Sequence, residues 1–274
     1  DPRAYEHYLK SDFKEYYQVY FPHYRGEPVV GDCNPRKLTF PWSLRLLQEQ
    51  MPGGKIVILI RNPCDRAFSE WWMDFYAGSE KLNFEEAIQE NLKYESAGLT
   101  LHDDEATALK LLQPWFESRY RREPQPTRAL LGTGYYWKGI ERAQKLFTPE
   151  RVKVVLLEAL QENPQGTLRD LLEFLEVRSD INLCATKLHN EAFGELSRKA
   201  VSLARCLKVP KMFSYGNKEK LLKSVGSLFS ALGDKKPVLQ KEMRNFLDAH
   251  YREHNRRLVE LTGLDLTAWK SGLT

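Results

Sequence analysis

The chain has 274 residues, 42% of them hydrophobic and 28% charged, which is ordinary for a globular protein with a substantial core. Its formal net charge of +4 suits an anionic ligand in a local cleft but is far below that of proteins that coat nucleic acid, so we expect no nucleic-acid partner. No stretch approaches the ~18 consecutive apolar residues that a membrane-spanning helix needs, so we expect no membrane span in this chain.

The first candidate strand is residues 29–32, Val-Val-Gly-Asp, and it ends in the carboxylate of Asp32. A short amphipathic helix pattern follows over 41–50. Together with the apolar run 56–60, these segments predict a strand–helix–strand unit with the usual right-handed crossover. Asp32 would then lie at the same sheet edge as Arg61, although a turn or capping aspartate is the alternative interpretation.

The run 56–60, Ile-Val-Ile-Leu-Ile, has no polar alternation, which predicts a strand buried on both faces. It ends at Arg61, after which Asn62 can cap a helix and Pro63 can occupy its first position. A cationic side chain then lies at the carboxyl end of a strand, beside the free N–H groups of a helix N-terminus. This arrangement predicts a phosphate or sulfate site, and the alternative is a surface arginine at an ordinary strand-to-helix turn.

Strands and helices continue to alternate beyond this point. Asn83 opens a capping-box pattern, Asn-Phe-Glu-Glu, which predicts a further helix. Prolines interrupt residues 95–128, which we interpret as a less regular segment that either faces an acceptor or is simply solvated. A helix over 136–147, a strand over 152–157 and a helix over 165–176 follow, so the sequence predicts an α/β fold, a three-layer sandwich with a central parallel sheet.

The C-terminal part begins with a strongly basic segment, residues 184–236. Such a segment is typical of a solvated face, or of a mobile stretch that closes over an anion. The terminal helix is predicted over 238–262. On it, His250 and His254 share one face but lack a third ligand nearby, so we expect polar helix surface there and no metal site.

The cysteines are widely spaced and form no zinc-binding pattern, which indicates reduced thiols in a cytoplasmic protein. A bridge between Cys184 and Cys206 stays open if the protein is secretory. The remaining two are Cys33 and Cys64.

Several of these segments together resemble the sulfotransferases that depend on 3'-phosphoadenosine 5'-phosphosulfate (PAPS), especially the branch with bacterial members and the Golgi heparan and carbohydrate sulfotransferases. The central match is IVILIRNPCDRAFSEW, residues 56–71, which is similar to the family's strand, its Arg-[Asp/Asn]-Pro-x-[Asp/Glu]-Arg-Ala-x-Ser motif and the helix that follows. Segments 31–35, 134–160 and 246–269 agree in the same order. The resemblance implies the P-loop-NTPase-like sulfotransferase fold.

In that family the first arginine of the motif and the serine eight positions later hold the 3'-phosphate of the cofactor. The resemblance places these roles on Arg61 and Ser69. Segment 190–199 is similar in placement to a basic loop that lies against the cofactor, which makes Arg198 and Lys199 secondary candidates. The resemblance implies PAPS as the cofactor, adenosine 3',5'-bisphosphate as its product, and no metal.

One departure concerns the other end of the cofactor. The family's Lys-Gly-Gly-Thr-Thr-like loop, which wraps the 5'-phosphosulfate, and its Lys-Glu-x-His-Phe segment do not occur in the sequence. We therefore expect residues 1–274 to form a single sulfotransferase-like domain that lacks the N-terminal strand and this loop, with the main base upstream of residue 1. Within the chain Asp32 is the candidate base, although it replaces the usual glutamate, and Cys33 replaces a lysine found in some heparan enzymes.

The residues and the resemblance together predict a sulfotransferase that moves a sulfuryl group from PAPS to a hydroxyl or amine, on a small molecule or a saccharide. A kinase-like enzyme would need a GxxxxGK[ST] loop, which the sequence does not contain. A catalytically silent module that holds an anionic nucleotide or saccharide on the same fold is the alternative. We expect a cytoplasmic protein, or alternatively an excised domain of the Golgi lumen or secretory pathway.

Overall fold

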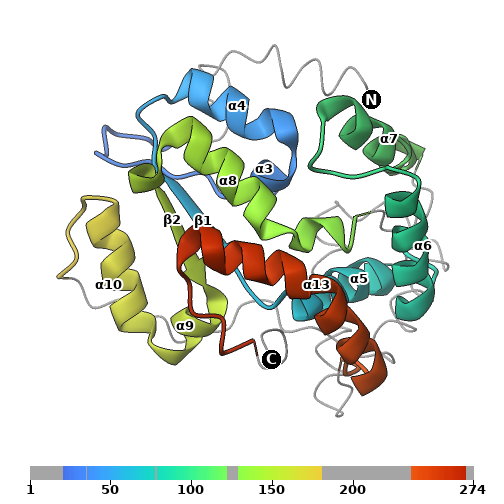
Figure 1. Ribbon diagram of the computed structural model, residues 1–274. Helices are drawn as coiled ribbons and strands as arrows, with labels where there is room; N and C mark the ends of the chain where they lie inside the picture. The colour runs from blue at the N-terminus through green and yellow to red at the C-terminus, as the bar shows by residue number, and fades with distance from the viewer. Residues whose placement is uncertain (1–20, 35, 78, 122–128, 181–235, 270–274) are drawn as a thin grey trace, which may run out of the picture.

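The computed structural model of the protein describes residues 21–34, 36–77, 79–121, 129–180 and 236–269 (Figure 1). Two of the expected binding residues, Arg198 and Lys199, lie outside these ranges, as do Cys184 and Cys206. No helix in the described ranges is both long enough and apolar enough to cross a membrane.

Two parallel strands form the sheet: β1 (Ile56–Ile60) and β2 (Val152–Leu156). Ile56 pairs with Val152 and Ile60 pairs with Leu156, so both strands end at the same edge. The residues that follow them, Arg61 and Leu157, therefore start the next segments side by side.

Helices make up most of the rest, and several begin or end where the sequence predicts. In chain order they are α3 (Arg36–Thr39), α4 (Pro41–Gln50), α5 (Pro63–Ala77), α6 (Phe84–Ser96), α7 (Glu105–Arg121), α8 (Tyr136–Phe147), α9 (Leu157–Glu162), α10 (Pro164–Phe174) and α13 (Lys241–Thr262), with the short 3-10 turns η1 (Gly132–Gly134) and η2 (Pro149–Arg151).

One hydrophobic core lies between the sheet and α8, which is flanked by α4 and α13 (Figure 1). Ile58 and Ile60 of β1 are buried there against Ile140 and Phe147 of α8, and Leu258 of α13 joins the same cluster. This packing fixes the carboxyl end of β1 relative to α8 and α13.

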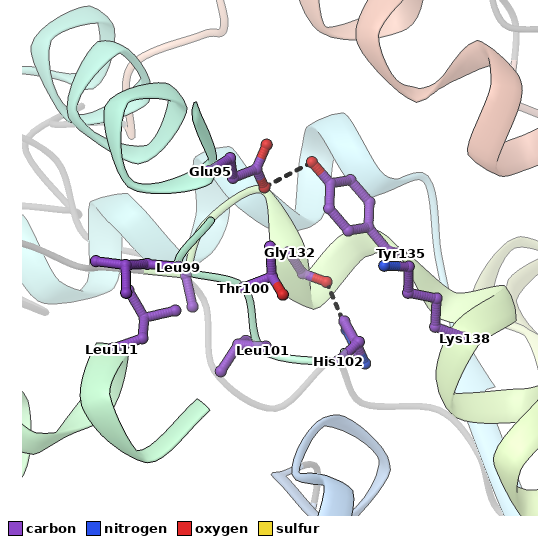
Figure 2. Close-up of a pocket in the computed structure, with 10 residues that line it drawn as sticks. Glu95, Leu99, Thr100, Leu101, His102, Leu111, Gly132, Tyr135 and Lys138 are labelled. Atoms are coloured by element: carbon purple, nitrogen blue, oxygen red, sulfur yellow. Dashed lines mark hydrogen bonds between the residues drawn. The ribbon is translucent and has the colours of Figure 1, made fainter. Parts of the chain in front are cut away.

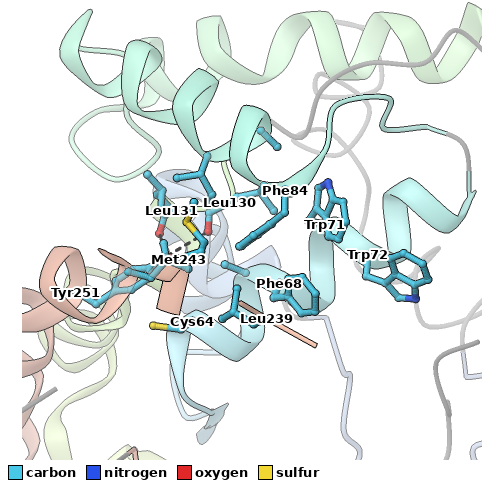
Figure 3. Packing of buried hydrophobic residues seen from close by; sticks show 14 of the residues in the cluster. Cys64, Phe68, Trp71, Trp72, Phe84, Leu130, Leu131, Leu239, Met243 and Tyr251 are labelled. Atoms are coloured by element: carbon cyan, nitrogen blue, oxygen red, sulfur yellow. Dashed lines mark hydrogen bonds between the residues drawn. The ribbon is translucent and has the colours of Figure 1, made fainter. Parts of the chain in front are cut away.

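A second core holds α5 against α6 and the first half of α13 (Figure 3). Aromatic rings fill much of it: the Phe68 and Phe84 rings meet edge to face with centroids 5.0 Å apart, and the Trp71 and Phe75 rings stack at 4.9 Å. Tyr251 of α13 is fully buried in this cluster. Helix α5, which follows Arg61, is therefore held in place by its packing against α6 and α13.

The strand predicted over 29–32 is wrong. These residues form neither helix nor strand, Val29 is 43% exposed, and β1 and β2 are the only strands within the described ranges. Two apolar residues bury too little area to offset the backbone entropy of an isolated strand, and Gly31 raises that cost. Asp32 instead makes an ion pair with Lys37 of α3.

The prediction that β1 is buried on both faces is also wrong. Ile58 and Ile60 are buried, but Val57 is 40% and Leu59 54% exposed. Helices α4, α8 and α13 cover one face only, and α9 and α10 contact β2. The structure thus shows an α/β fold with a small parallel sheet, and the three-layer sandwich stays a prediction.

Residues 95–121, the described part of the segment 95–128, are more regular than predicted. Helix α7 runs from Glu105 to Arg121 and passes through Pro114. Its start is capped by Asp104, whose carboxylate accepts from the Thr107 N–H at 2.8 Å. Buried Leu111 and a third hydrophobic cluster with α4 offset the hydrogen bond that a proline removes.

Candidate functional site

Arg61 is held at both its backbone and its side chain. Its carbonyl accepts a hydrogen bond from the Tyr136 hydroxyl at 3.0 Å, and its Nη2 donates to the Asp65 carbonyl at 3.1 Å. In an α-helix the Asp65 carbonyl also accepts from the N–H of Ser69. The guanidinium of Arg61 therefore lies beside the Asp65 carbonyl, which connects the first turn of α5 to the next turn, the one that carries Ser69.

The N–H groups at the start of α5 are already occupied, so the expectation that they are free is wrong. Asn62 N–H donates to Glu158 Oε1 at 2.9 Å, and Pro63 has no N–H. The N–H groups of Cys64 and Asp65 donate to the Asn62 Oδ1, at 2.9 and 3.4 Å. Asn62 caps the helix as predicted. Because its side chain accepts from the first N–H groups of α5, an anion at this place would have to be bound by side chains instead.

Lys236 is a second cation at this place, and we did not single it out from the sequence. Its Nζ lies 5.1 Å from the centroid of the Phe68 ring, next to Ser69 along α5. Burial, and after it the positive charge of Arg61, lower the pKa of Lys236. Two cations close enough to repel each other, both only partly exposed, are typical of an anion site.

The carboxylate of Asp65 offsets these charges only in part: it raises the pKa of Lys236, but less than burial and the charge of Arg61 lower it. Asp65 makes an ion pair with Arg244 of α13. Neither Arg61 nor Lys236 makes an ion pair with a carboxylate within the part of the chain that the structure describes. The site therefore keeps a net positive charge that a phosphate or sulfate would neutralise.

Comparisons with known proteins identify the family. A family model, "Sulfotransferase domain", matches residues 33–259, a span that contains Arg61, Ser69 and Lys236. The chain belongs to the sulfotransferase domain family. Members of this family transfer sulfate to an acceptor, so the protein is a transferase.

A solved structure supports the fold of this sulfotransferase. It is similar to the crystal structure of the sulfotransferase from Alicyclobacillus acidocaldarius, with a TM-score of 0.60 and 22% sequence identity. The match covers 94% of this chain and 74% of the other. Among curated proteins no match was found.

Asp32, the candidate base of the sulfotransferase, is not delivered to the sheet edge by a strand. It lies in an irregular segment before α3 and is exposed, and its carboxylate pairs with Lys37. Neighbouring Cys33 is exposed, and neither it nor the buried Cys64 is in a disulfide.

The two histidines of α13 belong to a hydrogen-bonded cluster away from Arg61 instead of forming polar helix surface. The Tyr135 hydroxyl donates to Glu95 Oε1 at 2.7 Å and lies 2.8 Å from His250 Nε2, which must therefore donate to it. The ring of His254 stacks on Tyr135 with centroids 3.7 Å apart, and its Nδ1 accepts from the Trp137 Nε1–H. No group of side chains in the described ranges could hold a metal ion.

A small pocket next to this cluster is lined by Tyr135, Glu95 and His102 (Figure 2). His102 lies within 2.8 Å of the Gly132 carbonyl through its Nε2, which must carry the proton. Burial lowers the pKa of His102 to about 4, so this histidine is neutral near pH 7. The hydroxyl of Tyr135 and the Nε2 of His102 are hydrogen-bonded within the pocket, whereas the His102 Nδ1 is buried and has no hydrogen-bond partner within the described ranges. We assign the pocket no part in sulfuryl transfer.

Proposed function

We propose that this sulfotransferase uses PAPS as its donor and that Arg61, Ser69 and Lys236 hold the 3'-phosphate. The observation that carries the proposal is the pair of cations, Arg61 and Lys236, that converge on the turn of α5 bearing Ser69, neither of them in an ion pair with a carboxylate in the described ranges. A dianionic phosphate fits such a site because it relieves the repulsion between the two cations.

Each side chain would contribute differently. The planar guanidinium of Arg61 presents a fork of N–H donors that matches two phosphate oxygens. Lys236 would supply a point charge, and the Ser69 hydroxyl a neutral donor. Because the first-turn N–H groups of α5 are occupied, these side chains carry the binding that a free helix N-terminus would otherwise supply.

When bound, PAPS supplies the sulfuryl group: its S–O bond to the phosphate breaks, sulfur bonds to the acceptor oxygen or nitrogen, and the acceptor proton leaves to a base. Such transfer depends on positioning and on stabilising charge, and the chain's residues described above anchor the nucleotide end. The proposal that Asp32 takes the proton rests on the resemblance alone.

The acceptor is proposed to be a hydroxyl or an amine, with saccharide hydroxyls as the first class to test, because the sequence resembles the carbohydrate branch. Membership of the sulfotransferase domain family does not favour the catalytically silent module. Transfer of labelled sulfate from PAPS to a panel of saccharides, phenols and amines would identify the class.

The experiment that tests the donor site compares Arg61→Ala with Lys145→Ala, a control that removes an exposed lysine of α8 paired with Glu141. Loss of a charge-assisted hydrogen bond is worth about 1.5–3 kcal/mol, so transfer at limiting PAPS should fall at least about tenfold in Arg61→Ala. The control should match the wild type. Equal rates for Arg61→Ala and the wild type would refute the assignment.

A further inference from the structure

Every residue of the turn that leads from β1 into α5, apart from Pro63, is held by another element. On the sheet side, Tyr136 binds the Arg61 carbonyl and Glu158 binds the Asn62 N–H. On the other side, α13 makes the remaining contacts, through side chains that the proposed function does not use. These contacts place the C-terminal helix directly against the anion site.

The α13 contacts come from two residues one helical turn apart. Arg244 pairs with Asp65, and four positions later Asp248 Oδ1 lies 3.2 Å from the Cys64 Sγ. Residues four apart share one face of a helix. A single face of α13 therefore contacts two consecutive residues, Cys64 and Asp65, in the first turn of α5. Figure 3 shows Cys64 at the start of α5.

The Cys64–Asp248 contact lies in the protein interior. Cys64 is 1% and Asp248 7% exposed, and burial followed by the charge of Asp248 raises the pKa of the Cys64 thiol. The thiol is thus protonated and donates to Asp248 Oδ1. The other oxygen, Oδ2, is buried and has no hydrogen-bond partner within the described ranges.

A buried carboxylate with so few donors costs stability. A thiol is also a weak donor, and the charge of Arg244 attracts Asp248 without donating a hydrogen bond to it in the described ranges, so these contacts offset the cost of burying the charge only in part. A residue kept at a cost to stability needs another explanation, and the position of α13 supplies one. Lys236 lies five residues before the start of α13 at Lys241. The position of α13 therefore determines the distance between Lys236 and Arg61, whose charge acts on it.

We propose that Asp248 is a positioning residue: through Cys64 it locks α13 to the first turn of α5 and so holds Lys236 opposite Arg61. This inference rests on the proposed 3'-phosphate site and adds a role for the C-terminal helix in forming it. Asp248 does not touch the phosphate. Its effect reaches the ligand only through the spacing of the two cations.

The test measures one ratio: the affinity for adenosine 3',5'-bisphosphate divided by that for adenosine 5'-monophosphate, by calorimetry on the full chain. Only the first ligand carries the 3'-phosphate, so the ratio isolates this site. In Cys64→Ala, which loses the donor to Asp248, the ratio should fall about three- to tenfold. Cys64→Ser keeps a donor and should restore the ratio to within about twofold of the wild type.

Asp248→Asn keeps an acceptor for Cys64 and should also retain the ratio, whereas Asp248→Ala should lower it. Arg256→Ala, which breaks exposed ion pairs on the outer side of α13, is the matched control and should change nothing in the ratio. If Asp248→Ala does not fold, the small Cys64 substitutions still decide.

Two results would overturn the inference, and they are distinguishable. A ratio that is unchanged in Cys64→Ala, even if the melting temperature falls, would show that the contact is only structural. A wild-type protein without any preference for the bisphosphate would remove the proposed 3'-phosphate site itself, and this inference with it.

Discussion

At the scale of single residues, Glu158 occupies a backbone N–H at the start of α5 that could otherwise bind an anion. Its Oε1 accepts from the Asn62 N–H at 2.9 Å, next to Arg61. Glu158→Ala would leave that N–H without its partner and should lower the free energy of unfolding by about 1–3 kcal/mol. Glu158→Gln keeps an acceptor and should cost less than half as much. Urea unfolding of both variants checks this, and equal losses would contradict it.

His102 provides a pH-dependent prediction. In the folded protein its pKa is about 4, lowered first by burial, whereas an unfolded chain takes up the proton near pH 6.5. Between these values the unfolded state binds more protons, so stability should fall as the pH is lowered, by about 3 kcal/mol for this group at most.

The variant His102→Gln isolates this contribution, because its amide can still donate to the Gly132 carbonyl but does not titrate. The slope of unfolding free energy against pH between about 6.5 and 4 should be shallower in the variant. Part of the pH dependence of stability should remain in the variant, because the pKa of His254 is also lowered to about 4. An identical slope in both proteins would count against a neutral His102.

Sequence reasoning could place Arg61 and the Asn62 cap because both follow from local order: a strand, its end and a helix start. Ser69 became a candidate only through the resemblance to the family motif. The sequence alone could not show that the Asn62 cap and Glu158 occupy the helix N–H groups, because Glu158 lies in α9, 96 residues away in the sequence. Sequence reasoning did not single out Lys236 because its role also depends on tertiary contacts. Only its position over the Phe68 ring distinguishes it from the other lysines of a basic segment.

At the scale of elements, the start of α6 is the clearest local signal. Asn83 Oδ1 accepts from the Glu86 N–H at 2.9 Å, and Glu86 Oε2 accepts from the Asn83 N–H at 2.9 Å, so the predicted capping box is confirmed. Asn83→Ala should lower stability by about 1 kcal/mol, and Asn83→Ser by clearly less. Thermal unfolding of both would check this, and equal melting temperatures for the two variants would speak against the cap.

Elements with strong local patterns were predictable: β1, α4, α5, α8 and β2 are confirmed within a residue or two. The failures involve competition with tertiary structure. Residues 29–32 have strand-like composition but no partner strand in the described ranges, and α7 continues through Pro114 because its apolar face packs on α4. The terminal helix begins at Lys241, three residues later than predicted.

At the scale of the whole molecule, the sulfotransferase domain match and the structural similarity define the family and the fold. The arrangement around the sheet explains the location of the site. Arg61 follows strand β1, and Glu158 lies in α9 directly after strand β2. Lys236, in the segment before α13, and Asp248, in α13 itself, come from the far end of the sequence. That convergence of distant segments is what the order of residues alone does not reveal.

The most direct test of the central claim is the ratio of affinities for adenosine 3',5'-bisphosphate and adenosine 5'-monophosphate in Arg61→Ala and Lys236→Ala, with Lys145→Ala as the control. The account predicts a wild-type preference for the bisphosphate that falls at least about tenfold in Arg61→Ala, falls clearly in Lys236→Ala and is unchanged in the control. An undiminished preference in Arg61→Ala would contradict it.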